Sequence, residues 1–105
     1  MESILASIKK MLGPVNEQTE FDHDIINHIN SVFMILRQLG IGPSGGFVIT
    51  GYTEAWTDFV PEEDRVEAIK SYTYLKVRLM FDPPSNSSVL DAIRNQIDEF
   101  EWRIA

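Results

Sequence analysis

The chain has 105 residues, a length that suits one domain, residues 1–105, with one hydrophobic core. Its hydrophobic fraction of 44% is that of a folded globular protein, and no apolar run approaches the ~20 residues of a membrane span, so we expect no membrane partner. With 16 acidic residues against 9 basic ones and no cysteine, the composition argues against sequence-specific DNA binding, disulfides and thiolate metal sites.

The first part of the chain predicts two amphipathic helices. One is expected at residues 2–12, where apolar residues recur on one helical face and Gly13-Pro14 ends the pattern. The second is expected at residues 20–39, where apolar residues form one wide stripe. Thr19, with Asp22 three residues later, predicts a capping-box start for this second helix.

Residues 40–61 break the helical pattern and predict a long, partly extended loop. The stretch GFVITGYTEAW alternates briefly between apolar and polar residues, which favours a short β-strand or hairpin arm within the loop. Trp56 and Phe59 follow this stretch, and we expect their large side chains to pin the loop to the core.

The loop begins with G-x-G-x-x-G at residues 40–45, the letter pattern of a dinucleotide-binding turn. That site needs a strand before the glycines and a helix after them, so that the helix N-terminus faces the pyrophosphate. Here a helix precedes the glycines, and Gly40 and Pro43 stand where a helix commonly ends. We therefore interpret the motif as the exit from a helix.

Residues 63–81 carry two conflicting patterns. The first pattern is a favourable helix start in the stretch PEEDRVEAIK. The second is an alternation of side chains in SYTYLKVRLMF with the period of a β-strand. No helix breaker separates the two halves before Asp82-Pro83-Pro84, so we expect one helix over residues 63–81. Apolar and aromatic side chains cover most of its circumference, which places it either at the centre of the fold or between subunits.

The last helix is expected to begin near Ser88, with Asp91 completing a second capping box. Its apolar residues are spaced alternately three and four apart: Leu90, Ile93, Ile97, Phe100 and Ile104. That spacing predicts a seam that packs within a helical bundle. Trp102 lies far round the helix from this seam on an acidic face, so it either contacts a partner or packs under a neighbouring helix.

Together these segments predict a mostly α fold, a small four-helix domain with one long, partly extended loop at residues 40–61. His23 and His28 diverge by roughly 140° on a helix and cannot share a metal ion. No pattern of residues supports catalysis, so we expect no enzyme, metal or cofactor. The candidate contacts with another subunit or a partner are Met34, Trp56, Phe59, Tyr72, Tyr74 and Trp102.

Nearly the whole chain resembles a known family. The resemblance is carried by TEFDHDIINHINSVFMILRQLGIGPSGGF, by TEAWTDF and by EAIKSYTYLKVRLMFDPPSNSSVLDAIRNQIDEFEWRIA, and it is most specific in QLGIGP, SYTYLKVRLMFDPP and IDEFEWRI. In these segments the sequence is similar to the head–tail connector (adaptor, head-completion) proteins of tailed bacteriophages and prophages.

The resemblance implies a structural protein with no enzymatic activity. It implies a homo-oligomeric ring of about twelve subunits on the portal protein, to which a stopper or tail-completion protein docks. Double-stranded DNA would pass through the lumen without sequence-specific binding, in the neck of a virion assembled in the bacterial host cytoplasm. The alternative is a small cytosolic helical interaction domain, monomeric or dimeric, with a groove lined by Trp56 and the helix at residues 63–81.

Overall fold

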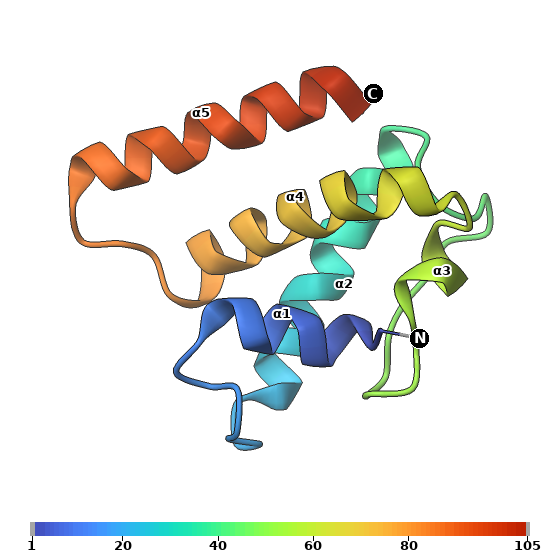
Figure 1. Ribbon diagram of the computed structural model, residues 1–105, viewed down its shortest axis with the longest axis horizontal. Helices are drawn as coiled ribbons and strands as arrows, with labels where there is room; N and C mark the ends of the chain where they lie inside the picture. The colour runs from blue at the N-terminus through green and yellow to red at the C-terminus, as the bar shows by residue number, and fades with distance from the viewer. Residues whose placement is uncertain (1, 105) are drawn as a thin grey trace.

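The computed structural model describes residues 2–104, which form helices joined by loops (Figure 1). The helices are α1 (Ile4–Leu12), α2 (Asp22–Gln38), α3 (Trp56–Phe59), α4 (Glu63–Phe81) and α5 (Ser87–Ile104). Within residues 2–104 there is no strand, only an isolated antiparallel bridge between Ser3 and Ala55. The predicted mostly α-helical fold is confirmed, and residues 63–81 form one helix. None of the described helices is long and apolar enough to cross a lipid bilayer.

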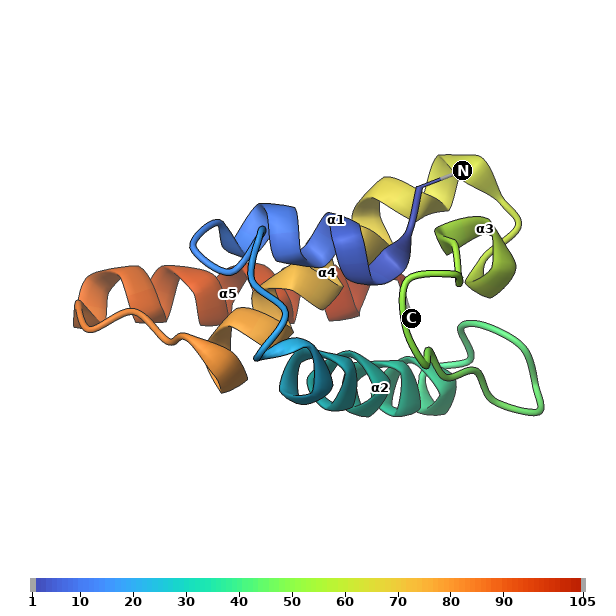
Figure 2. The ribbon, with the colours of Figure 1, turned by 90° about the horizontal axis from the view of Figure 1, so that it is seen from below.

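Helix α4 is the centre of the fold. It packs against α1, α2, α3 and α5, and Figures 1 and 2 show α5 running along one edge of it while α1 and α2 lie to either side. Tyr72 and Thr73, which are adjacent in the sequence and so point ~100° apart, are both completely buried. A helix buried over such a wide arc needs neighbours on several sides, and here they all come from its own chain.

The exit from α2 is built by the glycines of the G-x-G-x-x-G motif. The Ile41 amide donates to the Leu36 carbonyl at 2.9 Å and the Gly40 amide to the Arg37 carbonyl at 3.0 Å. These are the two bonds of a Schellman motif, and Gly40 supplies its left-handed residue with φ of 85°. The interpretation of this motif as a helix exit is confirmed.

The helix starts differ from the two predicted capping boxes. Helix α2 begins without a side-chain cap, and the carboxylate of Asp22 instead pairs with the Lys9 ammonium at 2.7 Å. Lys9 is buried and needs a counter-ion. The Asp22 carboxylate therefore pairs with this charge and does not cap a backbone amide at the start of α2. At α5 the cap is Asn86, whose side-chain oxygen accepts from the amides of Ser88 and Val89 at 2.8 and 3.2 Å. Both capping assignments from the sequence are therefore wrong.

No strand or hairpin forms in residues 40–61. The extended backbone at Ile49 bonds to the side chain of Asn30, which accepts from the Ile49 amide at 2.8 Å and donates to its carbonyl at 3.0 Å. An amide side chain on α2 thus takes the place of a neighbouring strand. The loop then forms the short helix α3, which the sequence did not predict.

The expected anchors of this loop, Trp56 and Phe59, are both buried. The Phe59 ring stacks on Phe33 of α2 with centroids 4.2 Å apart, and the Trp56 indole N–H donates to the Ser7 hydroxyl of α1 at 2.8 Å. These contacts tie α3 to both helices, so the prediction that Trp56 and Phe59 pin the loop to the core is confirmed.

Candidate interaction surfaces

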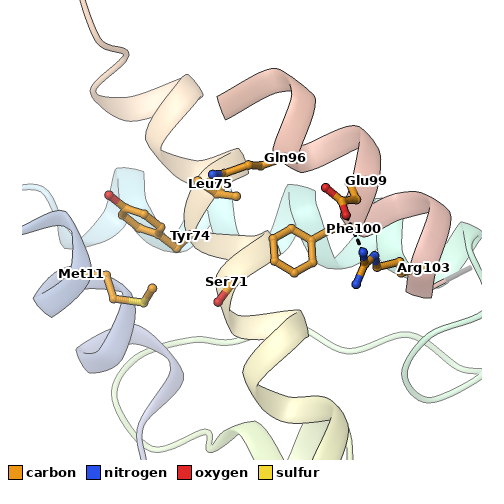
Figure 3. Close-up of a pocket in the computed structure, with 8 residues that line it drawn as sticks. All are labelled: Met11, Ser71, Tyr74, Leu75, Gln96, Glu99, Phe100 and Arg103. Carbon is orange, nitrogen blue, oxygen red and sulfur yellow. Dashed lines mark hydrogen bonds and ion pairs between the residues drawn. The ribbon is translucent and has the colours of Figure 1, made fainter. Parts of the chain in front are cut away.

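A groove of about 450 Å³ opens between α1, α4 and α5 (Figure 3). We call it the α5 groove, and it is lined by Met11, Ser71, Tyr74, Leu75, Gln96, Glu99, Phe100 and Arg103. Figure 3 shows residues of α4 between Met11 of α1 and Phe100 of α5, with the Glu99–Arg103 ion pair at one end. The groove is therefore mainly apolar and aromatic, with a charged rim.

The groove exists because α5 packs chiefly on α4 and leaves its side towards α1 open. Ile93 and Ile97 are buried in the predicted seam, which holds the helix along α4. Near its end, the Tyr72 hydroxyl of α4 donates to the carboxylate of Glu101 at 2.7 Å. Burial and this bond to a carboxylate both raise the pKa of Tyr72, so the hydroxyl stays protonated and continues to donate.

Trp102 is the most exposed large hydrophobic side chain of the described residues, with 86% of its surface accessible. Five positions after the buried Ile97, it lies about 140° away from that residue round the helix. No helix within residues 2–104 covers it, so the alternative left open by the sequence, packing under a neighbouring helix, does not occur there. An uncovered indole of this size is a strong candidate for contact with another protein.

A second apolar surface lies on α2 and the loop after it. We call it the α2 face; it is lined by Asn30, Phe33, Met34, Arg37, Gly45, Gly46, Phe47 and Val48. Met34 and Val48 are 61% and 62% exposed, which is unusual for two apolar side chains lining one hollow. Sequence reasoning missed Val48, although the alternation in the GFVIT stretch places it opposite its buried neighbour Ile49.

The candidate contact residues fall into two groups. Trp56, Phe59 and Tyr72 are buried in the core of the subunit, whereas Met34 and Trp102 are exposed and Tyr74 is half-buried in the α5 groove. Met34 and Tyr74 line different surfaces, Met34 the α2 face and Tyr74 the α5 groove.

The groove that the sequence placed beside Trp56 is a hollow of about 250 Å³ between α3 and the start of α4. It is lined by Glu2, Trp56, Thr57, Glu63, Val66 and Glu67. Trp56 contributes almost no accessible surface there because its ring is packed inward. This hollow therefore offers less apolar surface to a partner than the α5 groove does.

A buried charge network joins α1 to the loops before and after α2. Lys9 is 2% exposed, and its ammonium donates to the Tyr52 hydroxyl at 2.7 Å and to the carbonyl of Gln18 and pairs with Asp22. Burial alone would lower the pKa of Lys9, but its bonds to Asp22 and Tyr52 outweigh burial and raise it. Burial likewise would raise the pKa of Asp22, but Lys9 and Tyr52 hold it below its usual value. The network has a structural role, because the charges of Lys9 and Asp22 compensate each other inside the fold.

The two histidines lie apart from these surfaces. His28 packs edge-on against Phe81 with ring centroids 6.3 Å apart, and His23 is exposed near the start of α2. Among residues 2–104, no three His, Cys, Asp or Glu side chains are grouped so as to hold a metal ion. What the described surface does offer is apolar and aromatic contact area.

Comparison with known proteins connects this arrangement to a family. The family model described as "Phage connector protein" matches residues 4–105. Searches of curated proteins and of solved structures found no match. The family match covers nearly the whole chain, including every helix that builds the α5 groove and the α2 face. The protein is thus a structural protein of the connector type, and the chain belongs to the phage connector protein family.

Proposed function

We propose that this protein is a head–tail connector, or adaptor, of a tailed phage or prophage. About twelve copies form a ring on the portal vertex, in the virion neck, and a stopper or tail-completion protein docks on that ring. DNA passes through the lumen. The observation that carries the proposal is the family match over residues 4–105.

Trp102 supports docking on another ring. It projects from the end of α5, a helix held to the rest of the subunit mainly by α4. A Trp side chain supplies a large apolar area at low conformational cost, and such residues dominate binding energies at protein interfaces. We assign Trp102 to the contact with the portal protein.

The charge of the chain supports a conduit for DNA. Each subunit carries a net charge of −7, so about twelve copies carry roughly −84. Protein that must let DNA slide benefits from repulsion of the phosphate backbone, since Lys and Arg contacts would hold it. The acidic balance is therefore expected for a lumen wall and unexpected for a DNA-binding protein.

Binding to the portal protein of the same phage or prophage tests this function. We expect the wild-type chain to bind in a pull-down with purified portal rings, and Trp102→Ala to weaken binding by about 30-fold, as for an interface hot spot. Val89→Ala is the matched control, because Val89 is an exposed apolar residue at the other end of α5. If the wild-type chain fails to bind the portal, the proposal is wrong.

A second candidate is a small cytosolic helical interaction domain, monomeric or dimeric, with no enzymatic activity. The α5 groove favours it, because the groove is already open in a single chain and its volume lies within the roughly 300–1,000 Å³ of typical binding pockets. Light scattering separates the two candidates: an interaction domain stays a monomer or dimer when portal rings are added, whereas a connector joins them.

A further inference from the structure

The two apolar surfaces lie on opposite broad faces of a flat subunit. The Cα atoms span 37 × 33 × 20 Å, and Figure 2, which shows the shortest direction vertically, places α1 and α2 on opposite sides. Figure 3 looks into the α5 groove, and α2 lies behind α4 in that view. Met34 is five positions from Ile29, a buried residue of α2, and so points outwards, away from the α5 groove.

The α2 face suits the α5 groove in the kinds of side chain that it exposes. Met34 and Val48 are exposed at the α2 face, and the α5 groove presents the aromatic rings of Tyr74 and Phe100. Methionine has an unbranched, adaptable side chain, and its sulfur makes favourable contacts with aromatic rings. The Met34 thioether of one copy can therefore contact the Tyr74 and Phe100 rings of the next.

The charges at the edges of the two surfaces are also complementary. Arg37 lies one turn after Met34 and is exposed, and no hydrogen bond or ion pair is found for its guanidinium among the described residues. The rim of the α5 groove carries Glu99, whose side chain is 62% exposed although it pairs with Arg103. A carboxylate accepts several hydrogen bonds, so Glu99 can receive Arg37 of a second copy in addition.

Two different, complementary patches on opposite faces make a head-to-tail contact. Repeated from copy to copy, such a contact gives a closed ring when the rotation between neighbours is suitable. We propose that the subunits of the ring meet in this way, with the α2 face of one copy seated in the α5 groove of the next. The inference rests on the proposed connector function and names the surfaces that build its ring.

The absence of cysteine allows a direct cross-linking test. In the Met34→Cys/Gln96→Cys variant, each copy carries one thiol on its α2 face and one at its α5 groove. After assembly on portal rings and treatment with a short bis-maleimide, we expect a ladder of dimers, trimers and larger species on a denaturing gel. Each single variant alone should stay monomeric, and a mixture of the two single variants should stop at dimers.

The control pair is Met34→Cys/Val89→Cys, in which the second thiol lies on α5 outside the groove. A ladder from this pair equal to that from Met34→Cys/Gln96→Cys would overturn the assignment. Dimers from Met34→Cys alone would also overturn it, because they would mean that two α2 faces meet. The same conclusion follows if rings of the double variant give no ladder.

A charge placed in the contact gives an independent readout. We expect Met34→Glu to raise the subunit concentration needed for half-maximal ring formation on the portal at least about 10-fold. Met80→Glu, at another exposed methionine, should leave it unchanged. If the Met34→Glu variant assembles as the wild type does, the interface is wrong and the connector function stands; if the wild type never joins the portal, both fall.

Discussion

Gly42 lies against the ring of Phe59 with a backbone φ of 92°, a conformation that L-residues with side chains rarely adopt. A Cβ atom built at this position would come within 2.5 Å of the Phe59 ring. Phe59 is itself stacked on Phe33, so the ring has no room to withdraw. The glycine that resembled part of a phosphate-binding motif is thus required for packing the loop onto the core.

Substitution of this glycine should destabilise the subunit. We expect Gly42→Ala to lower the free energy of unfolding by roughly 2–4 kcal/mol, through the left-handed backbone and the clash with Phe59. Gly45→Ala is the control, because Gly45 has an ordinary φ and open space around its Cβ position, and it should change stability by less than about 0.5 kcal/mol. Urea denaturation measures both, and equal effects would contradict the packing role.

The Lys9–Asp22 pair predicts a dependence of stability on pH. Asp22→Asn should cost roughly 3 kcal/mol near neutral pH, because it leaves the buried Lys9 charge without its counter-ion. The pKa of Asp22 is lowered from 3.8, so its contribution is complete above that value and is lost as the pH falls through the depressed pKa. The cost of the substitution should therefore shrink in acid.

Denaturation of the wild type and of Asp22→Asn at pH 7 and at pH 3 checks this expectation. Asp24→Asn serves as the control, since Asp24 is in the same first turn of α2 but is exposed. A cost for Asp22→Asn that is no larger than that for Asp24→Asn would reduce the role of Asp22 to the helix dipole. At high pH the pair persists beyond 10.5, because the pKa of Lys9 is raised above that value.

At the scale of elements, α5 packs mainly against one other helix, α4. Its seam rests on α4, and the Tyr72–Glu101 hydrogen bond holds its last turns. We expect Tyr72→Phe to cost about 1 kcal/mol and to speed amide hydrogen exchange mainly in the second half of α5. Tyr74→Phe is the matched control, because its hydroxyl has only a 3.5 Å contact with Arg78. Unchanged exchange in α5 would show that the seam alone suffices.

Which parts of these elements could be predicted depends on where the deciding interaction lies. The helix at residues 63–81 was predictable because the absence of a breaker is a local property of the chain. The cap of α2 was not, because Asp22 is recruited by Lys9, which is distant in sequence and buried by the fold. The burial of Tyr72, which the sequence proposed as a contact residue, was not predictable either. Apolar and aromatic side chains cover most of the circumference of its helix, so the sequence does not tell which side the neighbouring helices cover.

The sequence identified Met34 and Trp102 as outward-facing because each lies opposite an unambiguous apolar stripe. The α5 groove could not be predicted from the sequence, because Met11, Tyr74 and Phe100 come from three helices whose relative placement is a tertiary property. Family membership was predictable from the overall order of segments, which the match over residues 4–105 confirms.

At the scale of the whole molecule, the flat shape of the subunit has a consequence for the assembly. If copies meet through their broad faces, the 20 Å thickness is the step from one to the next. About twelve such steps make a circumference of at least roughly 240 Å and a mean diameter of about 75 Å. The longer dimensions, 37 and 33 Å, then become the height and the radial width of the wall. In the proposed ring, a wall of that width would leave an opening of at least about 40 Å, so the thickness of the subunit would set the width of the central channel.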